Sequence, residues 1–155
     1  MDDTAKLEIN FGLKEVLNVM PVKTWIEKRE CKKGYHIKTT KKKFADIPEG
    51  SRMFIATPQI VNEYIKQIPY GKTVALSQLR NDLAIAYGAD KTCPVTTGIF
   101  LRIVSEAAFE DLHAGISIEA IAPFWRIVNP MSKLAKKLAC GVVFIETQRA
   151  LEVDA

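Results

Sequence analysis

Residues 123–128 read Pro123-Phe124-Trp125-Arg126-Ile127-Val128, and this hexapeptide is the most informative segment of the chain. It places two aromatic side chains beside one arginine, among apolar neighbours. Neither a phenyl ring nor an indole can act as a nucleophile or as a general base. Two roles remain open for Phe124 and Trp125. They fill a core, which aromatic residues often dominate, or they offer flat surfaces on which a nucleic-acid base stacks.

The hexapeptide resembles the centre of the O6-alkylguanine-DNA alkyltransferase family, whose members move alkyl groups from guanine onto their own cysteine. The family motif is Pro-Cys-His-Arg-Val-Val. Pro123, Arg126 and Val128 match it, whereas Phe124 replaces the reactive cysteine and Trp125 replaces the histidine. The resemblance implies the family's fold and a DNA-binding surface. The two replacements argue against its chemistry, so we expect a protein that is not an enzyme.

Further matches extend the resemblance over about residues 55 to 152. Residues 68–74 and 77–79 resemble the opening of the family's domain, and Cys140-Gly141 followed by Glu152 resembles its Gly-Gly pair and later glutamate. Residues 92–100 and 123–126 are similar to a Cys-less branch that carries Thr-Cys-Pro-x-Thr-Thr-Gly-Ile-Phe and Pro-Tyr-Trp-Arg. The alkyltransferase-like proteins, which bind alkylated guanine without repairing it, are a second Cys-less group.

The family's parts for flipping a base out of the duplex are largely missing. The arginine that fills the gap left by the flipped guanine aligns near Thr97, and Arg102 lies more than a turn further along. The aromatic residue that assists flipping aligns with Leu76, and an asparagine of the reactive array aligns with Ile116. These departures weaken the expectation of base flipping.

The resemblance makes Phe124, Trp125 and Arg126 the candidate base pocket or former reactive site. The family's arginine at the position of Arg126 anchors a turn, so the resemblance implies a structural role for Arg126. Glu152 stands at the position of a glutamate that orients the family's histidine. With no histidine present, three alternatives stay open for Glu152. It pairs with Arg126, it pairs with Lys72, or it is solvated.

The composition is that of an ordinary globular domain, with 48% hydrophobic residues among 155. A net charge of +4 and a pI near 8.9 permit nucleic-acid binding without requiring it. Three widely spaced cysteines and two isolated histidines predict no disulfide framework, metal site or cofactor. The chain shows no signal peptide and no apolar run of membrane length, so we expect a cytoplasmic protein without a membrane partner.

Hydrophobic periodicity and turn residues predict a mixed chain of helices and strands. Residues 7–30 show helical spacing broken at Pro21, and the next predicted elements are strands at 35–40 and 52–56 and helices at 57–68, 76–87, 95–111, 132–139 and 142–151. Residues 90–94 are expected to be a connection within a helix-turn-helix. We expect an α+β fold in which residues 1–50 form an N-terminal extension or small subdomain. Residues 51–155 then form a winged-helix, alkyltransferase-type DNA-binding domain.

The predicted helix at 95–111 carries most candidate DNA contacts. We expect Thr96, Thr97, Arg102 and Ser105 to face away from an apolar stripe that includes Ile99. Hydroxyl groups at a helix N-terminus suit phosphate oxygens, which the helix dipole also attracts. The alternative is that Thr96 only caps the helix and Arg102 only solvates its outer face.

Charges elsewhere modify this expectation. Lys72 and Leu76 complete the candidate DNA contacts, as a phosphate ligand and an apolar wedge, and Lys41–Lys43 form either a phosphate-contacting loop or a solvated one. Three acidic residues towards the C-terminal end of the same helix would repel phosphates, namely Glu106, Glu110 and Asp111.

Cys93 precedes a helix N-terminus, where the pKa of a thiol can be lowered. No histidine lies near it in sequence, so a partly buried turn cysteine is favoured, and Cys140 is interpreted as a packing residue. The function that we favour is non-catalytic binding of double-stranded DNA, with alkylated guanine as a candidate target. The alternative is a protein-interaction module that kept the fold and lost DNA.

Overall fold

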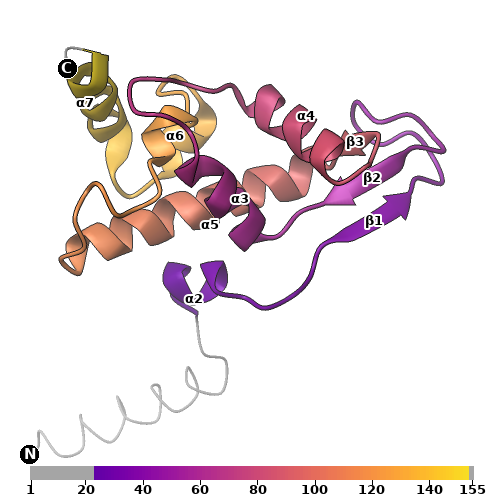
Figure 1. Cartoon of the computed structure of the whole chain (residues 1–155), viewed down its shortest axis with the longest axis horizontal. Helices are drawn as coiled ribbons and strands as arrows, with labels where there is room; N and C mark the ends of the chain where they lie inside the picture. Colours follow the sequence, from indigo (N-terminus) through magenta and orange to yellow (C-terminus); the bar gives the residue numbers. More distant parts are fainter. Residues whose placement is uncertain (1–22, 154–155) are drawn as a thin grey trace, which may run out of the picture.

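The computed structural model describes residues 23–153, which are arranged around one long helix (Figure 1). This part of the chain contains six α-helices, one 3-10 turn and three short strands, in the mixed α+β class that the sequence predicts. In chain order the elements are α2 (Trp25–Arg29), β1 (His36–Thr39), β2 (Arg52–Ile55), α3 (Pro58–Lys66), α4 (Leu76–Ala86), β3 (Lys91–Thr92), α5 (Pro94–His113), η1 (Phe124–Arg126), α6 (Lys133–Lys137) and α7 (Gly141–Val153). The predicted N-terminal helical segment before Lys23 lies outside the described residues.

The sheet has the order β1-β2-β3. Strands β1 and β2 are antiparallel, with His36 opposite Ile55, and β2 pairs in parallel with β3, with Phe54 opposite Thr92. The expectation that residues 90–94 are only a connection is therefore wrong. A strand of two residues is too short to show a periodic pattern, and its pairing with β2 depends on residues far away in the chain.

Local sequence signals set the ends of α3 and α4. The Thr57 hydroxyl accepts a hydrogen bond from the backbone N–H of Ile60 (3.1 Å), and Pro58 occupies the first turn, so the predicted start of this helix is confirmed. Helix α4 ends at Ala86, and Gly88 follows with a φ of +67°, a left-handed conformation that favours glycine.

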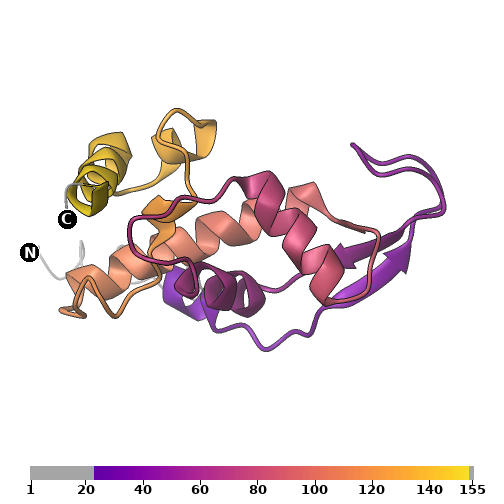
Figure 2. The same ribbon diagram turned by 45° about the horizontal axis from the view of Figure 1, so that its top comes forward.

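Helix α5 is 20 residues long and lies at the centre of the fold (Figures 1 and 2). Helices α2 and α3 pack against it, and η1 contacts it from the C-terminal part of the chain. Its buried residues are Thr97, Leu101, Val104, Ser105, Glu106, Ala107 and Ala108. Within residues 23–153, no helix combines the length and the apolar character that crossing a bilayer requires.

Candidate nucleic-acid interface

The two aromatic side chains of residues 123–128 belong to the core. Phe124 is 0% exposed and Trp125 is 2% exposed. The ring of Phe124 stacks on Phe144 with 5.9 Å between the ring centres, and it meets the Trp125 ring edge to face at 5.5 Å. Of the two roles that the sequence left open, the structure shows core packing, because neither ring has a free face for an extruded base.

The carboxylate of Glu152 is the hydrogen-bond acceptor for the polar groups near these rings. Its carboxylate accepts hydrogen bonds from the indole N–H of Trp125 (2.7 Å), from Nε of Arg126 (2.9 Å) and from the backbone N–H of Gly71 (3.1 Å). Burial raises the pKa of Glu152, but the hydrogen bonds from Arg126, Trp125 and Gly71 outweigh it and hold the pKa below its usual value. Among the three alternatives for Glu152, the structure shows the pair with Arg126.

Arg126 links this carboxylate to the loop between α3 and α4. Its Nη1 donates to the carbonyl of Ile68 (2.7 Å), and its own carbonyl accepts from the backbone N–H of Val74 (2.8 Å). Arg149 of α7 donates to the carbonyl of Trp125 (2.6 Å). Residues 123–126 thus have a structural role, and the charged groups of Arg126 and Glu152 are held by partners within the protein.

Helix α5 presents a different face from the one expected. Thr97 is 0% exposed and donates to the carbonyl of Cys93 (2.6 Å), while Ser105 is 1% exposed and donates to the carbonyl of Leu101 (2.7 Å). Their expected outward orientation is therefore wrong, and Thr97 has no surface to offer to DNA. A hydroxyl that bonds to the carbonyl four residues earlier can be buried without loss of its hydrogen bond.

The exposed residues of the first half of α5 are largely apolar. Val95 is 54% exposed and Ile99 is 52% exposed, so the expectation that Ile99 belongs to the buried stripe is also wrong. Thr96 is partly buried, and its hydroxyl oxygen has no hydrogen-bond partner among the described residues. Helix α5 is covered on several sides, so a single apolar stripe could not identify the open one.

An open groove of about 690 Å³ runs along this face of α5, and we call it the α5 groove. Its floor consists of apolar side chains and Gly98, and three cations from three different helices line it. The lining residues are Trp25, Lys28, Leu76, Val95, Gly98, Ile99, Arg102, Ile103, Leu134 and Lys137. A Cβ atom built on Gly98 would meet no atom of residues 23–153 within 4 Å, so this part of the chain leaves the backbone of α5 uncovered there.

Arg102 of α5 is one of the three cations that line the α5 groove. Its guanidinium carbon lies 5.2 Å from the centre of the Trp25 ring, and its side chain is 40% exposed. Nε of Arg102 lies 3.8 Å from a carboxylate oxygen of Glu106, too far for a hydrogen bond. This Nε atom is buried and has no hydrogen-bond partner among the described residues, so an anionic ligand in the groove could meet only the exposed end of the guanidinium.

The acidic residues of α5 have partners within the protein. Glu106 is 4% exposed and accepts a hydrogen bond from the backbone N–H of Ala139 (3.0 Å). Glu110 accepts from the backbone N–H of Trp25 (3.0 Å), and Asp111 pairs with Arg29 (2.6 Å). The C-terminal half of α5 is thus the surface on which α2 is bound.

The remaining candidate contacts lie in different places. Leu76 begins α4 and lines the α5 groove, whereas Lys72 is exposed in the loop before α4 and is not among the lining residues. Lys41–Lys43 are exposed in the loop between β1 and β2, which projects away from the end of the molecule that holds α7 (Figure 2). An ion pair between Arg80 of α4 and Asp46 (2.8 Å) holds that loop.

Cys93 and Cys140 are poor nucleophiles in this setting. Cys93 is only 4% exposed. Burial, with a further contribution from the negative charge of Glu106, raises the pKa of the Cys140 thiol to about 11. In the described part of the chain, no group of three or more His, Cys, Asp or Glu side chains could hold a metal ion.

Sequence reasoning named only two of the ten lining residues as candidate contacts and missed the other eight, among them Trp25, Lys28, Gly98 and Lys137. A signal for Trp25 and Lys28 was available, because Thr24 and Glu27 form a capping box that marks the start of a helix. Gly98 inside a helical pattern was a second signal. Nothing in the sequence places Lys137 of α6 beside α5.

Comparisons of the chain with protein-family models, with curated proteins and with solved structures find no match. The fold and the α5 groove are therefore the observations from which a function can be argued.

Proposed function

We propose that this protein binds double-stranded DNA without catalysis, through the first half of α5 and the α5 groove. The observation that carries the proposal is the convergence of Lys28, Arg102 and Lys137 from three helices, with no acidic side chain among the lining residues. Cations gathered on one face favour the phosphate backbone of nucleic acid, which supplies most of the affinity of non-specific binding.

The apolar floor of the groove fits one way of binding a duplex. Proteins that bind the minor groove combine cations on the phosphates with apolar side chains that wedge against base steps. Val95 and Ile99 are exposed apolar side chains that line the same groove as the three cations. Lys72 and the Lys41–Lys43 loop would contribute further phosphate contacts.

The resemblance to the alkyltransferases supports the same proposal. In it, α4 and α5 correspond to the helix-turn-helix of a winged-helix, alkyltransferase-type domain. A preference for alkylated guanine is a separate part of the proposal and comes from the resemblance alone. Because Phe124 and Trp125 are packed in the core, such a preference would depend on the surface of the duplex and not on a pocket for the base.

Fluorescence anisotropy with a labelled duplex tests the proposal. We expect binding that weakens steeply with salt, and we expect Arg102→Gln and Lys137→Gln each to lower the slope of log K against log[salt] by about 1. Lys66→Gln is the matched control, because this exposed lysine of α3 does not line the groove. Absence of binding at low salt would refute the proposal. Competition with a duplex that contains O6-methylguanine tests the preference, and equal affinities would exclude it.

The alternative function is a protein-interaction module that no longer binds DNA. The exposure of Val95 and Ile99 favours it, because a helix with an apolar face can lie in an apolar groove. Salt-independent capture of a partner that Ile99→Asp abolishes, together with no affinity for DNA, would support this alternative.

A further inference from the structure

Helix α2 packs against α5 without any fully buried residue of its own. It contains five residues, none of which is buried, and residues 32–36 that follow it are exposed. So short a helix is not stable in isolation, because most of its backbone groups lie at its ends. Its capping box joins Thr24 to Glu27 and does not attach the helix to the body of the protein.

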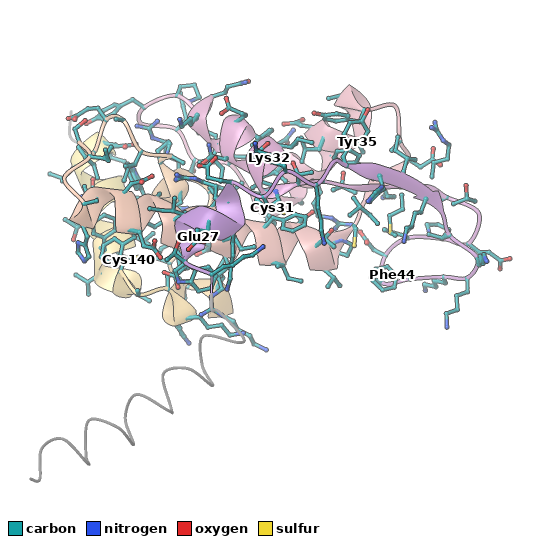
Figure 3. All side chains as sticks on the ribbon, turned by 90° about the horizontal axis from the view of Figure 1, so that it is seen from below. Glu27, Cys31, Lys32, Tyr35, Phe44 and Cys140 are labelled. Carbon is teal, nitrogen blue, oxygen red and sulfur yellow. The ribbon has the colours of Figure 1, made fainter. Side chains whose placement is uncertain are left out.

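The polar attachment comes from the last turns of α5. Glu110 accepts a hydrogen bond from the backbone N–H of Trp25 (3.0 Å). Asp111 pairs with Nη1 of Arg29 at 2.6 Å, and both side chains are largely covered, at 22% and 15% exposure. Figure 3, viewed from the side of α2, shows this helix lying across α5.

Once attached, α2 forms one wall of the α5 groove. Two cations contact the ring of Trp25, with Nζ of Lys28 at 4.3 Å and the guanidinium carbon of Arg102 at 5.2 Å from its centre. Such cation–ring contacts hold a cation in a defined position. The place of α2 on α5 therefore sets the positions of two of the three groove cations.

We propose that Glu110 and Asp111 are positioning residues that clasp α2 onto α5 and thereby place Lys28 and Arg102 for contact with an anionic ligand. This inference rests on the proposed DNA-binding function, for which it assigns a role to two acidic side chains. The proposed role gives Glu110 and Asp111 an effect on DNA affinity opposite to the one expected from their negative charge. Acidic groups near a DNA site ordinarily weaken binding, whereas these two strengthen it by holding the cations in place.

The charge effect and the positioning effect predict opposite changes in DNA affinity, so the role of Glu110 and Asp111 can be tested. The double variant Glu110→Ala with Asp111→Ala removes both hydrogen-bond acceptors and makes the protein more positive by two charges. If charge alone matters, the variant binds DNA more tightly than the wild type. If α2 is a clasp, the variant binds more weakly, and the salt slope falls by about 1 to 2 because Lys28 and Arg102 lose their fixed positions. The double variant Glu119→Ala with Glu146→Ala is the charge-matched control, since both residues are exposed and neither lines the groove.

Acrylamide quenching of tryptophan fluorescence reports the attachment of α2 without DNA. Trp125 is buried, so the change in quenching comes from Trp25, and a Trp25→Phe variant identifies its share. We expect stronger quenching in the Glu110→Ala, Asp111→Ala variant. The variant that exchanges the pair, Arg29→Asp with Asp111→Arg, keeps both the net charge and an ion pair at this position. It should therefore retain the protection of Trp25 and the affinity for DNA of the wild type.

Each result decides a different point. Unchanged quenching in the double variant, or tighter DNA binding equal to that of the control, overturns the clasp. If the wild type binds no DNA at all, the proposed function fails and the positioning role fails with it. Quenching then still shows whether Glu110 and Asp111 hold α2 on α5.

Discussion

Gly98→Ala should make the protein more stable and a poorer DNA binder. Glycine in the interior of a helix costs about 1 kcal/mol relative to alanine. The new methyl group meets nothing within 4 Å, so no clash offsets this gain. For a domain of this size, a gain of about 1 kcal/mol raises the melting temperature by about 2–4 °C.

The same methyl group occupies the floor of the α5 groove, where the proposed duplex approaches the helix backbone. A loss of about 1 kcal/mol of binding free energy, the lower end of what overpacking costs, weakens DNA binding roughly fivefold. Thermal unfolding followed by circular dichroism measures the first effect, and fluorescence anisotropy measures the second.

Gly34→Ala is the matched control, because a Cβ atom there also meets nothing within 4 Å and Gly34 lies outside the groove. We expect this variant to bind DNA as the wild type does. The reasoning is refuted if Gly98→Ala binds DNA with unchanged or higher affinity while its stability rises. The duplex would then not approach the backbone of α5 at this position.

Three further predictions concern the core and the thiols. Because the pKa of Glu152 is lowered in the folded state, its carboxylate stabilises the fold above about pH 4.5, and this contribution is lost as the pH falls through the pKa of the folded state. Glu152→Gln should therefore weaken the dependence of the free energy of unfolding on acidic pH. It should also lower this free energy by about 3 kcal/mol, because Arg126 is left unpaired. Thr97→Val should leave DNA affinity unchanged and lower the free energy of unfolding by about 1 kcal/mol, so a large loss of affinity would contradict the burial of Thr97. Mass spectrometry after incubation with an O6-methylguanine duplex should find no methyl group on Cys93 or Cys140, because Cys93 is buried and the pKa of Cys140 is raised to about 11.

The local features of the fold follow from short-range signals in the sequence. The start of α3 depends on Thr57 and Pro58, and the end of α4 is followed by Gly88, whose lack of a side chain permits a positive φ. The absence of a nucleophile from the hexapeptide also follows from residue types alone. Residues adjacent in the chain were enough for each of these inferences.

The α5 groove could not be predicted in the same way. Periodicity assumes that a helix has one covered face, and α5 is covered on several sides, so Thr97 was expected outside and Ile99 inside. The indole of Trp125 donates to Glu152 across 27 positions of the chain, a partnership that no local pattern encodes.

By itself, the amino-acid sequence determined where most helices begin and end and which chemistry residues 123–128 lack, because hydrogen bonds and side-chain types within a few residues fix both. Only the tertiary structure decided which side of α5 is open and which charges line it. Trp25 and Glu110 are 85 positions apart, and their contact forms only when the whole chain packs around α5. The position of each groove cation is therefore a property of that packing and not of its neighbours in sequence.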